Sequence, residues 1–497
     1  MKWYKDRAVS EKGKQCDKAI LDKNLKYLLY LSTECEKLGE IKATHIMCRA
    51  QYYYFAFNCY DSYRAFSKKT DEKHLERSLF LCRKSLMLAD KYKESTEYKG
   101  DEKAHKWFRG YYFQLLVNYA NLLDSSGRII SAIEEYFKVV TVARFDMAEG
   151  NLAMSLMNYA KLIFDQNQRS FLLGEAKYLF EDVLSHENLT MTSEAEASFS
   201  KSLDNLIKIH VSRSKIKGTQ RKMSTEEREY RKWVGENVLA LNPLNDVVHD
   251  INAAYDPIHF GKFQTPVDYE ESTRFQLIGL INEIKQEYVT ARFQLYRGLT
   301  DYGVEFSDLD VYLVDNWDGA IYAYSVEQLK DAFKAIYSIF DRISFFINAY
   351  FKLKINFRSV SFKHIWESQK LLTASKDNYA LRGLNWIEKD LYRNDKKTKS
   401  ENYKDFLDPK MKEINTVRNF IEHRYLRVVQ DSQKTKCSDF IYEIRISDFR
   451  SMGLYLLKKC REAIILLLVT VYHEENKNTE DGVTLFSRTY DDSMKLQ

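Results

Sequence analysis

Proline is scarce in this sequence: only 4 of its 497 residues are proline, and the first of them is Pro243. Glycine is uncommon as well, with 17 residues. Proline breaks helices and glycine weakens them, so the stretch before Pro243, which lacks proline and is rich in Leu, Ala, Lys, Glu and Tyr, favours helices throughout. The sequence therefore predicts an all-α fold, with room for two or three domains.

Patterns that hold metals and cofactors are missing too. The seven cysteines contain no C-x-x-C pair, and the H-x-x-C spacing of His45 and Cys48 has no second close pair to complete a zinc site. The H-E-x-x-H, G-x-G-x-x-G and P-loop patterns are absent, and no cluster of Asp or Glu has metal-binding spacing. We therefore expect reduced thiols, no metal and no cofactor, and the missing P-loop argues against ATP hydrolysis.

Long apolar runs are also lacking. The first residues have no apolar signal-peptide stretch, and the apolar run 463–469 is too short to span a bilayer. The formal net charge of +5 is small, so it allows an RNA partner without requiring one. These features predict a cytoplasmic protein with no membrane partner.

Residues 1–208 are expected to form an array of helix pairs similar to tetratricopeptide (TPR) repeats. Within 116–136, small and large residues occupy the positions at which paired helices approach and fill the gap between them. Asn158-Tyr159-Ala160 then repeats Asn118-Tyr119-Ala120, and Ala176 and Phe180 follow in a second helix. The terminal proline of the repeat is absent. Arrays of this kind bind a protein, a peptide or a ligand, so such a partner is expected here.

A basic connector and a linking helix are expected at 209–265. Basic residues gather at its start, which is typical of a solvated hinge; contact with a phosphate backbone is the alternative. The capping box Ser224-Thr225-Glu226-Glu227 predicts that a helix begins there. The basic residues are Lys208, just before the connector, and Arg213, Lys215, Lys217, Arg221 and Lys222 within it.

Residues 266–480 are expected to form a bundle of four or five helices, followed by a tail at 481–497. Alternation at 441–446 predicts a short strand that pairs back on 426–429 as a small β-hairpin. The last helix is apolar enough to be buried or to form a dimer contact. The expected helices lie near 271–299, 326–352, 384–391, 409–425 and 449–473.

One of these helices carries the candidate chemistry. Asp408 followed by Pro409 is typical of a helix start. Helical spacing from there places an apolar arc beside a polar arc. The apolar arc holds Ile414, Val417, Ile421 and Tyr425, and the polar arc holds Arg418, Asn419, Glu422 and His423.

The sequence Arg418-Asn419-x-x-x-His423 resembles the signature of the HEPN superfamily, which contains nucleases and nucleotide-binding helical bundles. Further blocks are similar, in order and spacing, to the HEPN branch that carries a TPR-like array in front of the bundle. The resemblance covers about 222–476. The blocks are 241–246, 284–292, 346–350 and 381–386 with Asp390.

This resemblance implies a metal-independent endoribonuclease that works as a homodimer, in which two such helices form one composite site. It also implies a toxin or antiviral defence effector that cuts tRNA or other cellular RNA, with the array sensing a signal or docking a partner. His423 would transfer protons and Arg418 would neutralise the phosphorane-like transition state. Asn419 would orient the His423 ring, and Glu422 would hold the Arg418 guanidinium.

The role of the remaining polar residues and the function of the whole chain each have an alternative interpretation. Glu287, Arg292, Arg424 and Arg427 are candidates for substrate binding, and for Glu287 and Arg292 the alternative is a structural ion pair or a core-edge contact. The whole chain has an alternative as well: a non-catalytic HEPN/TPR scaffold that binds a protein or a nucleotide.

Overall fold

The computed structural model divides the chain into two compact units. Unit 1 comprises Met1–Asn158 and Leu173–Arg213, and unit 2 comprises Tyr159–Leu172 and Ser214–Gln497, so two of the three boundaries fall inside helices. The described residues are 2–68, 72–213, 216, 222–265, 273–301, 303–314, 317–392, 408–477, 483–484 and 495. Lys215, Lys217 and Arg221 of the expected connector, and most of the tail, lie outside them.

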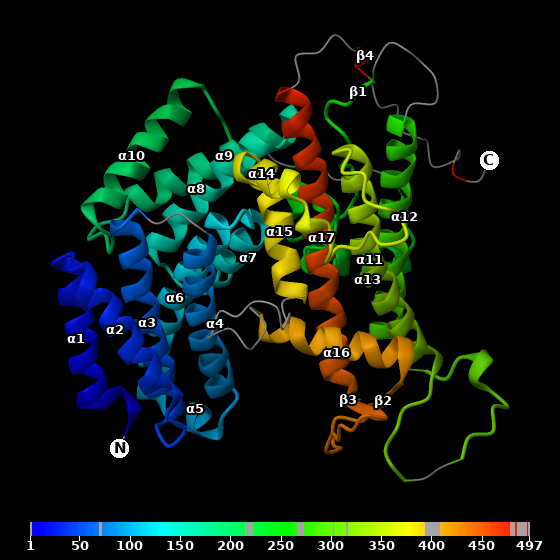
Figure 1. Ribbon diagram of the computed structural model, residues 1–497, viewed down its shortest axis with the longest axis horizontal. Helices are drawn as coiled ribbons and strands as arrows, with labels where there is room; N and C mark the ends of the chain where they lie inside the picture. The colour runs from blue at the N-terminus through cyan, green and yellow to red at the C-terminus, as the bar shows by residue number, and fades with distance from the viewer. Residues whose placement is uncertain are drawn as a thin grey trace. The chain divides into compact units, whose positions relative to one another are not determined.

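The first part of the chain is a succession of helices, each followed closely by the next (Figure 1). Asp6, Asn24 and Asp101 cap three of them by accepting hydrogen bonds from first-turn N–H groups, as such side chains do at helix starts. The helices are α1 (Arg7–Leu21), α2 (Leu25–Glu40), α3 (Ile46–Phe66), α4 (Glu72–Lys93), α5 (Thr96–Gly100), α6 (Glu102–Ser125), α7 (Ile129–Val140), α8 (Asp146–Leu162), α9 (Gln166–Leu184) and α10 (Ser193–Lys208).

Within unit 1, sequential neighbours pack on one another, from α2 on α3 and α3 on α4 to α6 on α7. The turn between α6 and α7 contains Gly127 with φ +89°, a conformation that glycine adopts without strain. Ala120 and Ala132, small positions of the predicted repeat, are fully buried. The predicted helices are confirmed here, and the aromatic residues Tyr53 and Phe57 are buried in helix packing.

Unit 2 is built around its last helix, α17 (Ile446–Lys477), which contacts α12, α13, α15 and α16 (Figure 1). The side chains along the middle of α17 are buried. The expected all-α fold is confirmed. The structure adds α14, which the sequence did not predict. The other helices are α11 (Thr225–Glu236), α12 (Thr273–Thr300), α13 (Tyr324–Tyr350), α14 (Gln369–Asp377), α15 (Tyr379–Tyr392) and α16 (Pro409–His423).

The predicted β-hairpin is wrong in its direction. Strands β2 (Tyr425–Val429) and β3 (Ile441–Arg445) pair in parallel, with Tyr425 opposite Ile441. The chain reverses twice between the strands: first after β2, where Gln433 N–H donates to the Gln430 carbonyl, and again at Asp439 and Phe440, where Ser438 N–H donates to the Ile441 carbonyl. A second, antiparallel pair joins β1 (Gln264–Thr265) and β4 (Val483–Thr484).

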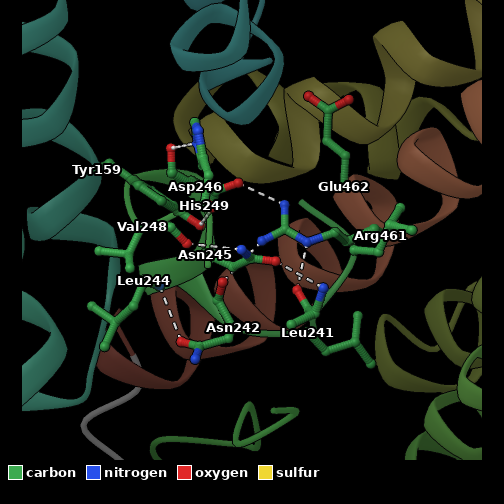
Figure 2. A network of polar contacts seen from close by, with 12 residues as sticks. Tyr159, Leu241, Asn242, Leu244, Asn245, Asp246, Val248, His249, Arg461 and Glu462 are labelled. Atoms are coloured by element: carbon green, nitrogen blue, oxygen red, sulfur yellow. Dashed lines mark hydrogen bonds and ion pairs between the residues drawn. The ribbon is translucent and has the colours of Figure 1, made fainter. Parts of the chain in front are cut away.

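A buried polar network fixes the segment that precedes the bundle onto α17 (Figure 2). The Arg461 guanidinium forms an ion pair with Asp246 at 2.6 Å and donates to the carbonyls of Ala240 and Asn242 at 2.5 and 2.9 Å. Tyr159 donates to the other Asp246 oxygen at 3.0 Å. Arg461 and Asp246 are almost fully buried, so the network is structural and not a surface site.

Ser224 caps α11 and accepts from Glu227 N–H at 3.1 Å, so the predicted capping box does begin a helix.

Among the described residues, no helix has both the length and the apolar character that crossing a membrane requires.

Candidate functional site

Helix α16 begins and packs largely as its sequence indicates. Asp408 accepts a hydrogen bond from Lys410 N–H at 3.0 Å, and Pro409 occupies the first turn. The apolar arc differs at its far end. Tyr425 lies in β2 because the helix ends at His423, and Ile421 is only partly buried. The buried residues of α16 are Met411, Ile414, Val417 and Phe420.

Arg418 is held in a defined place beside this core. Its Nη2 lies 2.9 Å from Glu422 Oε2, one helical turn away, which is the ion pair that the sequence predicts. The guanidinium carbon lies 4.7 Å from the centroid of the Tyr337 ring, within range of a cation–π interaction. Its Nε is buried and has no hydrogen-bond partner within the described residues. The guanidinium therefore has a fixed position and an N–H left to donate.

Helix α13 supplies two neighbours of Arg418 that the sequence did not reveal. Burial raises the pKa of Tyr337 to about 12, although a hydrogen bond with Tyr392 and the nearby Arg418 oppose that rise. Burial likewise raises the pKa of Asp341, against the Phe362 N–H and Arg418. Both residues lie far from Arg418 in the sequence, so no local pattern could place them there.

His423 stands at the exposed end of the same helix. Its side chain is 69 % exposed, and its Nε2 lies 3.5 Å from Glu422 Oε2. Asn419 is exposed, and the polar contact given for the His423 ring is with Glu422, so orientation of the ring by Asn419 stays a prediction. One carboxylate, Glu422, thus contacts both the candidate cation and the candidate proton-transfer group.

A comparison with protein families places this helix in a known domain. Residues 269–474 match the model of the LA2681-like HEPN family. This part of the chain is a HEPN domain. The match includes α16 with Arg418 and His423, and it lies within the region where the sequence resembles HEPN proteins. Comparisons with curated proteins and with solved structures gave no match.

Two further arginines of the HEPN domain follow α16 directly. Arg424 donates to the Asp439 carbonyl at 2.9 Å and lies over the Phe420 ring, and it is exposed. Arg427 forms ion pairs with Asp318 and Glu443 and is mostly buried. Arg424 therefore remains accessible to a substrate, whereas Arg427 joins β2 to β3 and to the segment before α13.

The two substrate-binding candidates on α12 also differ in exposure: one is partly exposed and the other is buried. Glu287 forms an ion pair with Arg342 at 2.7 Å on a partly exposed surface, and burial raises its pKa, against the effect of Arg342. Arg292 is buried and bidentate with Asp256, with both N–O distances 2.8 Å. It also donates to Tyr230 Oη and the Leu239 carbonyl, each at 2.9 Å. For Arg292 the structure favours the core-contact interpretation.

Replacing Arg292 with lysine tests this interpretation. We expect the free energy of unfolding to fall by about 2 kcal/mol, because lysine keeps the charge but cannot reproduce the buried fork to Asp256. Urea denaturation followed by circular dichroism measures the change, and the exposed Arg358→Lys is the matched control. Wild-type stability together with weaker RNA binding would instead make Arg292 a substrate-binding residue.

Proposed function

We propose that the protein is a metal-independent endoribonuclease whose HEPN domain cleaves RNA with α16. One observation carries the proposal: Arg418, fixed by Glu422 and Tyr337, shares a helix end with the exposed His423. A fixed guanidinium and an accessible imidazole are the two groups that RNA cleavage without a metal requires.

The chemistry assigns a separate task to each group. His423 takes the proton from a ribose 2′-hydroxyl, whose oxygen then attacks the adjacent phosphorus. The bond from phosphorus to the 5′-oxygen breaks, that oxygen takes a proton from water, and His423 gives up its own proton to the resulting hydroxide. Arg418 donates to the phosphorane oxygens as their negative charge increases, and the partial exposure of its side chain, 29 %, supports that assignment. The products are a 2′,3′-cyclic phosphate and a 5′-hydroxyl.

Resemblance to HEPN ribonucleases extends the proposal to the assembly and its role. One HEPN domain supplies a single Arg418 and a single His423, and a two-fold dimer would bring two pairs to one cleft. The middle of α17 is buried within unit 2, so we assign the dimer contact to the exposed face of α16. The helical array would sense a signal or dock a partner, as in a toxin or antiviral defence effector acting on tRNA or other cellular RNA.

Cleavage is expected to persist in excess EDTA and to leave a 2′,3′-cyclic phosphate, because attack by the 2′-hydroxyl needs only acid–base groups and a cation. The measurement uses the full-length protein, end-labelled RNA and treatment of the fragments with a cyclic-phosphate-opening enzyme. Complete dependence on Mg²⁺ or Mn²⁺, or fragments with plain 3′-hydroxyl ends, would contradict the mechanism.

A non-catalytic binding module is the second candidate, and one observation favours it. The described residues between α12 and α13 expose large apolar side chains, with Phe306 85 % and Tyr312 95 % exposed. Acidic residues lie among these apolar residues in the sequence and would repel phosphates; they include Glu305, Asp308 and Asp310. This surface suits a protein partner with a basic, apolar face. Absence of cleavage together with saturable binding of such a partner would favour this second function.

A further inference from the structure

Three side chains of unit 1 with metal-binding chemistry come together outside the HEPN domain. Asp146 and Glu149 lie in the first turn of α8, and His186 follows the end of α9. One ligand atom from each lies within 4.8 Å of the others. Asp146 and Glu149 are 3 % and 8 % exposed, and the His186 side chain is 14 % exposed.

The polar contacts of this cluster are partly internal. Asp146 Oδ1 lies 3.0 Å from His186 Nδ1 and 3.5 Å from Nε of the exposed Arg144. Asp146 Oδ2 accepts from the Thr190 N–H at 2.7 Å and from the Thr190 hydroxyl at 2.9 Å. Phe145 N–H donates to Glu149 Oε1 at 3.3 Å.

The second carboxylate oxygen of Glu149 is the observation that indicates a ligand. Oε2 is buried and has no hydrogen-bond partner among the described residues, and a buried carboxylate oxygen without a partner is unfavourable. Burial raises the pKa of Glu149, the Phe145 N–H and His186 lower it, and the carboxylates of Asp182 and Asp146 raise it again. A cation among these carboxylates would satisfy Oε2 and remove the repulsion.

We propose that Asp146, Glu149 and His186 bind one divalent transition-metal ion, for which Zn²⁺ is the probe. One imidazole nitrogen and two carboxylates form a ligand set that Zn²⁺ accepts, with water completing the coordination. An imidazole ligand favours transition metals over Mg²⁺ and Ca²⁺. Sequence spacing did not indicate the site because His186 enters it from the end of the following helix.

The ion joins the first turn of α8 to the segment after α9, so its effect is on the stability of unit 1. A ligand that binds only the folded chain raises the unfolding temperature by mass action. The site lies outside residues 269–474, and EDTA therefore lowers the thermal stability without affecting RNA cleavage.

The test uses the full-length protein, stripped of metal with EDTA and dialysed into metal-free buffer. Isothermal titration with Zn²⁺ is expected to give one ion per chain and a higher unfolding temperature. Glu149→Gln, which keeps the side-chain shape, and His186→Ala are each expected to weaken binding at least ~10-fold. His364→Ala is the control, because His364 is an exposed histidine beside the carboxylate of Glu367.

Co²⁺ substitution distinguishes this site from the free cysteines. The proposal predicts cobalt d–d bands without a thiolate-to-metal charge-transfer band. A charge-transfer band, no binding at one equivalent of Zn²⁺, or wild-type affinity in folded Glu149→Gln would each overturn it. Circular dichroism confirms that each variant is folded.

Discussion

His423→Ala is expected to lower RNA cleavage by about 100-fold or more, because a positioned acid–base group contributes at least that much to such reactions. The His423 side chain is 69 % exposed, so its removal leaves the core of α16 intact and the unfolding temperature unchanged. Single-turnover cleavage of labelled RNA measures the effect. His364→Ala, which removes an exposed histidine elsewhere in unit 2, is the control and should cleave at the wild-type rate.

Arg418→Ala tests the second group of the same site. Loss of a transition-state donor costs about 3 kcal/mol, so a similar fall in rate is expected. Arg418→Lys should remain impaired, because lysine cannot present the planar fork that the ion pair with Glu422 fixes. Wild-type cleavage by a folded His423→Ala or Arg418→Ala protein would remove that residue from the site.

Mixing the two inactive variants tests whether the site is shared between two copies. A mixed dimer of Arg418→Ala and His423→Ala contains one intact arginine and one intact histidine, so partial recovery of cleavage is expected if the cleft is composite. Light scattering that shows a monomer with full activity at nanomolar concentration would contradict the shared site.

Arg461→Met is expected to lower the free energy of unfolding by about 3–5 kcal/mol, because it leaves Asp246 buried without its cationic partner. The guanidinium also satisfies the carbonyls of Ala240 and Asn242, so the segment before the bundle loses three contacts at once (Figure 2). Urea denaturation measures the change, and the exposed Arg358→Met is the matched control.

The pH dependence of this variant provides a second readout. Burial already raises the pKa of Asp246, and Arg461 opposes that rise. Without Arg461 the pKa of folded Asp246 rises further, so the folded state binds a proton that the unfolded state releases. Stability then falls as pH rises, and the deficit relative to wild type should shrink as pH falls from about 8 to about 5. A deficit that is independent of pH would mean that Asp246 relaxes to a solvated position.

Local features of the fold and of the site could be read from the sequence because their causes are local. Asp408 and Pro409 fix the start of α16, and helical periodicity alone places Glu422 where it can hold Arg418. Ser224 likewise caps α11 as its capping box indicates. In each case the interacting groups lie within one or two turns of a helix.

Features that depend on distant segments could not be predicted in this way. Tyr337 reaches Arg418 from α13, and the partner of Arg292 is Asp256, which lies outside any helix. The parallel pairing of β2 with β3 depends on the path of the intervening chain and not on the alternation of either strand. Sequence periodicity shows which face of an element is apolar, but not which element covers that face.

The central claim is that α16 cleaves RNA through the ribose 2′-hydroxyl without a metal. The most direct measurement incubates the full-length protein in excess EDTA with an RNA oligonucleotide and with its matched analogue that is 2′-deoxy at the cleaved position. The account predicts cleavage of the RNA by the wild type, none of the analogue, and almost none of either by His423→Ala. Cleavage of the analogue at that position, or equal cleavage of the RNA by the wild type and His423→Ala, would contradict it.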